Sequence, residues 1–599
     1  MDPIKVDFSG KGKPKEVVIP PERKILKIII NVIVTLIGAG VTYYFLLPAF
    51  NLKAVEFYYF VAIVAAIYVV MTAITSKALT NPEYIPYVKK RSIVPVAIVL
   101  VFALILGVGY IVGCAFFRAK AYSKIIDVST ENFGESDSIT TITSLSDFSS
   151  VPMIDAEVAE NLANKKLGEL SDWVSQFVID GDYSTQINYE GNPYRIFPLK
   201  YGDVFKWFNN TRDGIPAYIA VNMYTQESKA VVLDKPIEVS SSEYLNEKLA
   251  RVLRFNFPTY MFGTPSLEID DDGHPWWICE RVDKTIGLIG GTDVVGVVLV
   301  DACDKNNVSY YTVDDINGNP ELKWIDQIYS ADLLVQQYNY YGKYTKGFIN
   351  AYIGQSGVIS TTEGSTYIAS GDDVWLYTGV TSVTSDDSIV GFAIINQRTK
   401  EAVFQKIAGT TEKGAQASAE SIVSDKGWKA TFPLLLDLDG EATYFMALKD
   451  NSVVKSYAMV SVERVQDAVR SEDDANPDLE ACIKAYVNKV RTNKVTIKIN
   501  YDAVLPDSIS GEGGTQESGN TENNTQTAKL ETVKGVISDI RTAVVNGNSY
   551  YYIALDNKNV YYSISASDDN NVVILNVGDK VTINYKAAEG KIIDAKSIA

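Results

Sequence analysis

The first 117 residues of the chain hold three long apolar runs. These runs cover Ile28–Phe50, Phe57–Thr75 and Ile93–Phe117, and none contains Asp, Glu, Lys, Arg or His. An apolar helix of about 20 residues crosses the ~30 Å hydrocarbon core of a bilayer. The pattern therefore predicts three transmembrane helices. The first run is longer than the apolar stretch of a removable signal peptide, and no small-residue cleavage site follows it.

Downstream of these runs, helical spacing of apolar residues alternates with short β-rich stretches. The spacing predicts helices over Asp155–Gly168, Ser240–Arg254 and Ala415–Gly427. Ser240 and Glu243 also stand at the separation of an N-terminal capping box. Short strands and polar turns follow each helix. A helix followed by hairpins thus recurs, which predicts repeated antiparallel α+β units.

The third of these blocks has the clearest pattern. Strands are predicted over Trp428–Asp437, Ala442–Leu448 and Val454–Glu463, and Asp439-Gly440 joins the first two. Asp-Gly between apolar runs is a strong hairpin signal, because both central residues of this turn take positive φ.

The composition changes near the C-terminus. A last helix is predicted with Asn476 as its cap and Pro477 at its first position. Asp507–Thr527 is then dominated by Gly, Ser, Thr, Asn, Gln and Glu, which predicts a flexible linker. Lys529–Ala599 has five β-rich runs and predicts a small all-β module. The predicted apolar face of the last helix consists of Ile483, Tyr486, Val487 and Val490.

These patterns divide the chain into consecutive segments, and the predicted fold class is a membrane-anchored α+β protein. The segments are a head (1–27), three transmembrane helices (28–117), a polar juxtamembrane stretch (118–150), an α+β unit (151–239), a second unit with a connecting segment (240–372), a third unit with a helix (373–503), a flexible linker (504–528) and a β-barrel (529–599).

Charge separates the membrane anchor from the rest of the chain. Residues 1–117 carry 12 Lys and Arg against 6 Asp and Glu, which leaves 43 basic and 67 acidic residues of the chain's totals of 55 and 73. An acidic surface repels the phosphate backbone of a nucleic acid, because binding it needs clustered Lys and Arg. Nucleic acid is therefore not a predicted partner.

Positive charges also predict how the anchor is oriented. The head and the second loop together hold eleven Lys and Arg, whereas the first loop has Lys53 alone. Lys and Arg close to membrane spans are retained on the cytoplasmic side. We therefore expect a multi-pass protein of the cell membrane with a cytoplasmic N-terminus, and an extracytoplasmic bulk after Phe117.

The helix and hairpins of the third block, which end in YFMALKDNSVVKSYAMVSVE, resemble the PepSY domain. Two earlier runs, GIPAYIAVNMYTQESKAVV and DVVGVVLVDACDKNNVSYYTV, resemble its terminal hairpin. PepSY domains are small α+β modules of exported bacterial proteins that are associated with restraining envelope proteases or binding at the cell surface, and they imply no catalytic residues. The whole plan resembles a group of uncharacterised Gram-positive multi-pass envelope proteins, which implies a location in the envelope.

The C-terminal module resembles an OB fold, with five runs in the order KGVISDIRTAVV, SYYYIALD, NVYYSI, VVILNVGDKVTINYK and KIIDAKSIA. This resemblance implies that a strand face binds oligonucleotides or oligosaccharides. The module has 8 basic and 8 acidic residues, a balance that disfavours single-stranded nucleic acid. Tyr550, Tyr552 and Tyr561 are candidates for stacking on a sugar, although tyrosines on barrel strands more often serve packing.

Two residue pairs are candidates for close packing or bonding. Gly109 and Gly113 have the spacing of small residues that lets two membrane helices approach closely. Cys279 and Cys303 lie on two runs that flank a glycine-rich stretch. A hairpin with a three-residue loop at Gly290–Thr292 places the two sulfurs opposite each other, in range of a disulfide. The alternatives are another register and two reduced thiols.

The sequence contains no pattern of catalytic, cofactor-binding or metal-binding residues. Its single histidine, His274, follows an Asp-Gly turn, and no Cys or carboxylate ligands are grouped with it to complete a zinc site. Walker loops, Gly-x-Ser-x-Gly elbows and Cys-x-x-Cys motifs are also absent. We therefore expect neither an enzyme nor a cofactor.

The function that fits these observations is a non-enzymatic cell-envelope protein whose extracytoplasmic domains bind or scaffold cell-wall polymer or envelope proteins. Two alternatives stay open. One is an extracytoplasmic hydrolase of wall polymer, because a catalytic pair of carboxylates needs no sequence motif. The other is a regulator of a membrane or envelope protease through the PepSY-like units.

Overall fold

The chain falls into two units, Met1–Gly513 and Gly514–Ala599, which are described separately. The predicted linker 504–528 lies outside the described residues. A computed structural model describes residues 18–134, 141–383, 385–471, 477–493, 495–500, 531–545, 548–556, 560–565, 572, 575–585 and 591–598.

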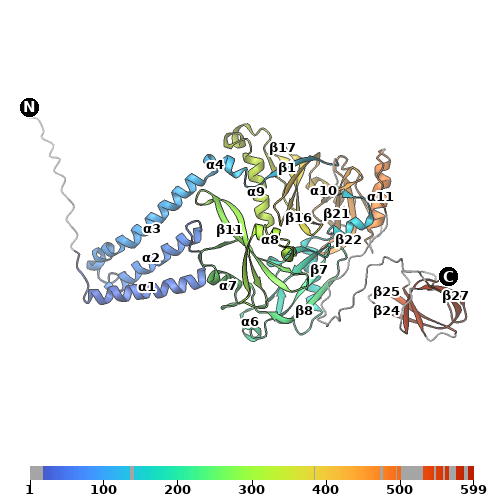
Figure 1. The fold of residues 1–599 in the computed structure, drawn as a ribbon, viewed down its shortest axis with the longest axis horizontal. Coiled ribbons are helices and arrows are strands. Elements are labelled where there is room, and N and C mark those ends of the chain that lie inside the picture. The colour runs from blue at the N-terminus through green and yellow to red at the C-terminus, as the bar shows by residue number, and fades with distance from the viewer. Residues whose placement is uncertain are drawn as a thin grey trace, which may run out of the picture. The chain divides into compact units, whose positions relative to one another are not determined.

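The first unit begins with three helices that are long and apolar enough to cross a membrane, as predicted. They are α1 (Lys24–Leu46), α2 (Val55–Ser76) and α3 (Ile85–Gly113), and α2 packs against both of the others (Figure 1). A polar contact ties α1 to α2. Asn31 donates to Thr72 Oγ1 at 3.3 Å and accepts from Thr75 Oγ1 at 3.0 Å. Such bonds satisfy polar groups that would otherwise be exposed to lipid.

Four β-sheets form most of the body that follows these helices (Figure 1). Two of them are antiparallel, and their main strands are paired in the order in which they follow one another along the chain. The first contains β4 (Thr185–Tyr189), β5 (Asn192–Phe197), β7 (Ile215–Asn222) and β8 (Ser228–Ile237). The second contains β10 (Ser266–Ile269), β11 (Pro275–Ile286), β12 (Gly290–Asp301) and β13 (Val308–Thr312), with β9 (Met261–Phe262) paired to β11.

The other two sheets each gain an edge strand from the N-terminal side of the body. The third runs in the order β1 (Val128–Asn132), β18 (Ala402–Thr410), β17 (Ser385–Asn396), β16 (Asp373–Ser382) and β14 (Ile359–Thr361), and β15 (Thr366–Ser370) also pairs with β16. The fourth runs in the order β2 (Thr141–Ile142), β20 (Leu434–Leu438), β21 (Glu441–Asp450), β22 (Val453–Ser461) and β23 (Val469–Arg470), and β19 (Lys429–Ala430) also pairs with β21.

The strands β1 and β2 lie within 118–150, the range predicted as a polar juxtamembrane stretch, for which the sequence analysis assigned no strands. They pair parallel to β18 and β20, so that Val128 faces Ala402 and Thr141 faces Asp437. Their side chains are mostly polar because edge strands expose much of their surface.

Helices and short turns connect and cover the sheets. The helices are α4 (Ala115–Tyr122), α5 (Ala156–Gly168), α6 (Val204–Asn210), α7 (Leu249–Asn256), α8 (Val313–Gly318), α9 (Ala331–Tyr344), α10 (Glu412–Ser421) and α11 (Leu479–Arg491). The short elements are η1 (Pro82–Tyr84), η2 (Leu145–Ser150), η3 (Gly181–Tyr183), η4 (Pro320–Leu322), the short π-helix η5 (Asn350–Gly354) and the strand pair β3 (Phe177–Ile179) with β6 (Leu199–Tyr201).

Local signals placed several elements correctly. Asp155 caps α5 by accepting a hydrogen bond from the Val158 N–H at 2.9 Å. The turn between β20 and β21 has φ values of 54° at Asp439 and 88° at Gly440, as the Asp-Gly pattern predicts. The predicted apolar face of α11 is buried. The cap of α11, however, is Asp478, and Asn476 lies outside the described residues.

The prediction of a helix over Ser240–Arg254 is wrong in its first half. Only α7 is helical, and the capping box is absent from its described N-terminus. The Glu243 carboxylate instead accepts hydrogen bonds from Tyr201, Trp207 and Thr211. These three donors compete with the backbone N–H that a capping box would use.

The end of α3 shows which residues lie against Gly109 and Gly113. A Cβ on Gly109 would lie 3.1 Å from Leu288 Cβ, and one on Gly113 would lie 3.1 Å from the Ile286 carbonyl oxygen. Leu288 lies in the turn of the β11–β12 hairpin, and Ile286 is the last residue of β11. Within the described chain, the small residues admit a β-hairpin against the helix. Their packing against another membrane helix stays a prediction. The helix also ends at Gly113, four residues before the predicted end.

One apolar core passes through all three predicted α+β ranges of the body. It includes Ile142, Ile196, Leu253, Phe392 and Ile497. The sheets consequently pack as a single body, with sites available where sheets meet.

The second unit is a closed barrel of five strands in the order β24-β25-β26-β28-β27. β26 pairs parallel to β28, and the other pairings are antiparallel. The barrel encloses an apolar core that includes Ile553, Tyr562 and Ile583. The strand bounds are Glu531–Val545, Asn548–Leu555, Tyr561–Ser565, Ile592–Ile598 and Lys580–Tyr585 in that spatial order.

Candidate functional site

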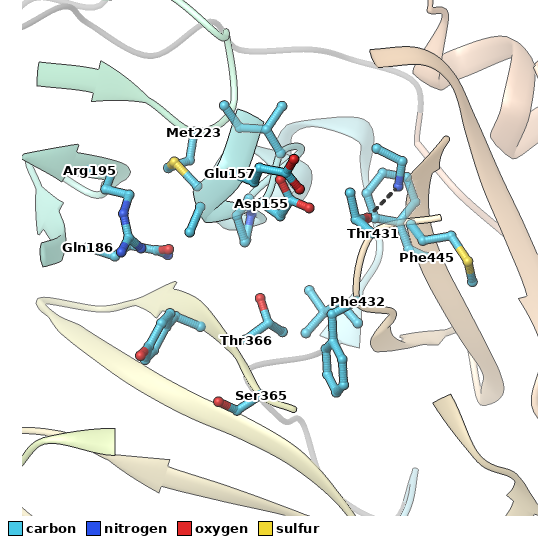
Figure 2. Close-up of a pocket in the computed structure, with 17 residues that line it drawn as sticks. Asp155, Glu157, Gln186, Arg195, Met223, Ser365, Thr366, Thr431, Phe432 and Phe445 are labelled. Atoms are coloured by element: carbon cyan, nitrogen blue, oxygen red, sulfur yellow. Dashed lines mark hydrogen bonds between the residues drawn. The ribbon is translucent and has the colours of Figure 1, made fainter. Parts of the chain in front are cut away.

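A cavity of about 250 Å³ lies where three of the sheets meet the start of α5 (Figure 2). β4 and β5 contribute Gln186 and Arg195, and β15 contributes Thr366 and Tyr367. β21 and the loop before β20 contribute Met446 and apolar neighbours. Segments distant in the sequence therefore converge on one small space, a common arrangement for ligand sites.

Arg195 is a half-buried cation without a carboxylate partner among the described residues. Its Nε and Nη2 both donate to Ser184 Oγ, at 3.1 and 2.9 Å. The guanidinium also lies 5.8 Å from the centre of the Phe197 ring. Burial lowers the pKa of Arg195, although nearby Tyr367, Glu160 and Asp155 oppose this shift. A guanidinium has five N–H groups, so several remain free to bind a ligand.

Gln186 supplies a second free donor next to Arg195. The two residues face each other across the β4–β5 ladder, and Figure 2 shows their side chains beside each other. Gln186 is only 7% exposed, yet its Nε2 has no hydrogen-bond partner among the described residues. A buried donor without a partner costs about 1–3 kcal/mol. A ligand acceptor in the cavity would remove this cost.

The acidic residues at the start of α5 are already neutralised in part. Lys449 of β21 donates to Asp155 Oδ2 at 2.6 Å and to Glu157 Oε2 at 2.7 Å. Burial and these two acids act in opposite directions on the pKa of Lys449, and the net effect raises it. The lysine therefore stays charged and lowers the repulsion that these acids would exert on an anion.

Apolar side chains complete the wall of the cavity. Phe432, Phe445, Met446, Met223 and Ile154 line it. Such a wall lowers the local dielectric and strengthens hydrogen bonds between a charged ligand group and Arg195. The cavity can thus bind a small group that has anionic oxygens at one end and apolar atoms at the other.

The candidate disulfide between Cys279 and Cys303 is not formed, because the hairpin has another register, and the alternative of two reduced thiols holds. The turn lies at Gly287–Ile289, so Ile286 pairs with Gly290 and Cys279 pairs with Val298. A β-bulge after Arg281 shifts the ladder further. Both cysteines are free thiols, and burial raises the pKa of each.

The predicted sugar-stacking tyrosines have mixed environments. Tyr552 and Tyr561 lie on one face of the β25–β26 ladder, because Ala554 is opposite Tyr561. The Tyr561 hydroxyl donates to Asp539 Oδ2 at 2.8 Å, and Arg541 lies 5.2 Å from its ring centre. The side chain of Tyr550 lies outside the described residues. Sugar stacking stays a prediction.

Two carboxyl groups of the body lie deep inside and serve as cross-links. Glu268 accepts from the backbone N–H groups of Asp326 and Gln327, at 2.8 and 3.0 Å. Asp326 accepts from the Asn188 N–H at 2.6 Å and lies 3.3 Å from Arg398 Nη2. Burial raises the pKa of Glu268 to about 7. Neither group lines the cavity described above.

The sequence analysis did not identify the cavity residues. Arg195 lies in β5, and a charged residue within a largely apolar strand was the only local signal. Gln186 and Tyr367 belong to no sequence motif. The two side chains lie close together only because separate sheets pack against each other.

Comparison of the chain with protein-family models, with curated proteins and with solved structures gave no match. The assignments to PepSY-like and OB-like families therefore stay predictions, and the site is interpreted from its own geometry.

Proposed function

We propose that this multi-pass membrane protein is a non-enzymatic binding component of the cell envelope. Its body faces away from the cytoplasm, and the Arg195 cavity binds the carboxylate terminus of a peptide or of a peptide-bearing wall polymer. The orientation rests on the positive charges that flank the membrane helices.

The observation that carries the proposal is the pair of unused donors in the cavity. Arg195 has free N–H groups and no carboxylate partner among the described residues, and the neighbouring Gln186 Nε2 is buried without an acceptor. A planar guanidinium beside an amide donor matches the two oxygens of a carboxylate. The volume of about 250 Å³ admits one or two residues of a chain end but not a folded domain.

The test uses the full chain purified in detergent and isothermal titration calorimetry. The probes are a short apolar peptide with a free C-terminus, the same peptide with an amidated C-terminus, and inorganic phosphate. We expect saturable binding of the free peptide alone. Arg195→Gln should weaken this binding about tenfold to a hundredfold, because a charge-assisted bond is worth about 1.5–3 kcal/mol.

Two variants control this experiment. Arg491→Gln removes an exposed arginine at the end of α11 and should leave binding unchanged. Arg195→Lys keeps the charge but loses the planar fork, and it should bind with intermediate affinity. Equal affinity for free and amidated peptides, or full binding by Arg195→Gln, would contradict the proposal. Binding of phosphate alone would show that the cavity recognises another anion.

A further inference from the structure

The chain's only histidine lies beside an aspartate and a cysteine at one end of the second sheet. His274 immediately precedes β11, and Asp301 ends β12. The ladder places Trp276 opposite Asp301, so the turn before β11 and the turn after β12 are neighbours. The potential ligand atoms of His274, Asp301 and Cys303 all lie within 4.8 Å of one another. A nitrogen, an oxygen and a sulfur ligand therefore converge although no sequence motif groups them.

The carboxylate at the centre of this cluster is held in a fixed orientation. Asp301 Oδ1 lies 2.8 Å from His274 Nε2 and accepts from the Cys303 backbone N–H at 2.8 Å. Asp301 Oδ2 accepts from Asn307 Nδ2 at 3.1 Å. Supporting bonds of this kind orient the ligands of metal sites.

The thiol of Cys303 differs from the other buried thiols of the chain. Cys279 donates to the Trp277 carbonyl at 3.8 Å, and Cys482 donates to the Tyr457 carbonyl at 3.3 Å. Cys303 is equally buried, but its sulfur makes no hydrogen bond to a described residue. It also lines a second cavity, of about 870 Å³.

The distances between the three potential ligand atoms are close to those around a bound metal ion. Zinc binds nitrogen and oxygen at about 2.0–2.2 Å and sulfur at about 2.3 Å, so ligand atoms around a tetrahedral zinc ion are about 3.3–3.8 Å apart. The 2.8 Å separation of His274 Nε2 and Asp301 Oδ1 is shorter than this range, and the 4.8 Å limit on the three atoms is longer, so side-chain rotation is needed before all three atoms bind one ion. The His274 side chain is 36% exposed on a turn and has room for this adjustment.

We propose that His274, Asp301 and Cys303 bind one divalent transition-metal ion, and that zinc is the ion that suits them best. Imidazole and thiolate ligands favour zinc over magnesium or calcium, which prefer oxygen ligands. Three protein ligands leave the fourth position of a tetrahedral ion open to water or to a ligand group. The site is independent of the Arg195 cavity.

The test begins with the full chain in detergent after treatment with a chelator. Zinc is titrated in competition with a chromophoric chelator, and cobalt(II) is then used as a spectroscopic substitute. We expect one equivalent of zinc, and a cobalt spectrum with a sulfur-to-metal charge-transfer band. Cys303→Ser should abolish this band, and His274→Ala should weaken zinc binding at least about tenfold.

Cys279→Ser is the matched control, because Cys279 is a buried thiol on the neighbouring strand that does not belong to the cluster. It should keep both the stoichiometry and the charge-transfer band. Circular dichroism confirms that each variant is folded, and the isosteric change Asp301→Asn provides a second test of the ligand set. The proposal would be overturned if the wild-type chain bound no zinc tightly. It would also be overturned if the cobalt band persisted in Cys303→Ser.

Discussion

The buried carboxyl group of Glu280 in β11 is expected to make the stability of the fold depend on pH. It is 3% exposed, and a Cβ on Gly263 would lie 2.2 Å from its Oε2, so only glycine leaves room for the carboxyl group. Ser330 Oγ lies 3.5 Å from the same oxygen. Burial is the main cause that raises the pKa of Glu280, from 4.5 to about 7. The folded state therefore holds a proton that the unfolded chain has already lost between these pH values.

Replacing Glu280 by Gln should remove this pH dependence. The folded protein binds more protons than the unfolded chain from about pH 4.5 to pH 7, so the wild type loses stability as the pH rises through this window. The loss is on the order of 3 kcal/mol. We expect Glu280→Gln to melt like the wild type at pH 4.5 and at a higher temperature at pH 8. Thermal unfolding at several pH values measures this, with Glu190→Gln as an exposed control.

A wild-type melting temperature that rises relative to Glu280→Gln between pH 5 and pH 8 would contradict this assignment. It would mean that the carboxylate is stabilised in the fold by a charge or donor stronger than Ser330.

At the scale of elements, the contact between α3 and the β11–β12 hairpin ties the membrane anchor to the body. Gly113 is buried in this contact, and Tyr122 of α4 donates to its carbonyl oxygen at 2.8 Å. Lys53, which lies between α1 and α2, adds a 2.8 Å ion pair with Asp283 on the same hairpin. This pair is about one-third exposed, so it is expected to contribute little to stability.

Larger residues at Gly109 and Gly113 should weaken the packing of the β11–β12 hairpin against α3. Gly109→Val and Gly113→Val introduce side chains where a Cβ alone already lies 3.1 Å from its neighbours. We expect each to destabilise the contact by about 1–3 kcal/mol, the usual cost of overpacking. Limited proteolysis should then cut the hairpin turn faster than in the wild type. Gly107→Val is the control on the same helix, because nothing lies within 4 Å of a Cβ there.

Equal cleavage of Gly107→Val and Gly113→Val would show that packing of the hairpin does not depend on small residues at Gly109 and Gly113. Melting curves of the three variants provide an independent measurement of the same ranking.

At the scale of the whole molecule, the segment that follows the membrane anchor adds an edge strand to two of the sheets. β1 and β2 pair with strands that lie far downstream, and one core joins the sheets between them. Contacts of such large sequence separation are costly in loop-closure entropy and form late in folding. The body is therefore expected to fold only after most of the first unit has been synthesised.

The proposed orientation of the anchor is tested with intact cells or protoplasts. Protease added from outside should remove the body after Phe117 and leave the head before α1 intact, because eleven Lys and Arg flank the predicted cytoplasmic side. An immunoblot with antibodies against the head and the body measures both fragments. Protection of the body in intact cells, with digestion after lysis, would place it in the cytoplasm.

Local physical chemistry in the sequence determined the three membrane helices, the cap of α5, the Asp439-Gly440 turn and the apolar face of α11. Each depends on side chains within one or two turns of chain, so neighbours in sequence suffice. Tertiary structure alone decided the register of the β11–β12 hairpin, the hydrogen-bond donors to Glu243, and the packing of the hairpin against Gly109 and Gly113. It also brought Arg195 to Gln186 and Tyr367, and His274 to Asp301 and Cys303. These outcomes depend on which sheets and turns pack together, and residues distant in sequence carry no local signal of that choice.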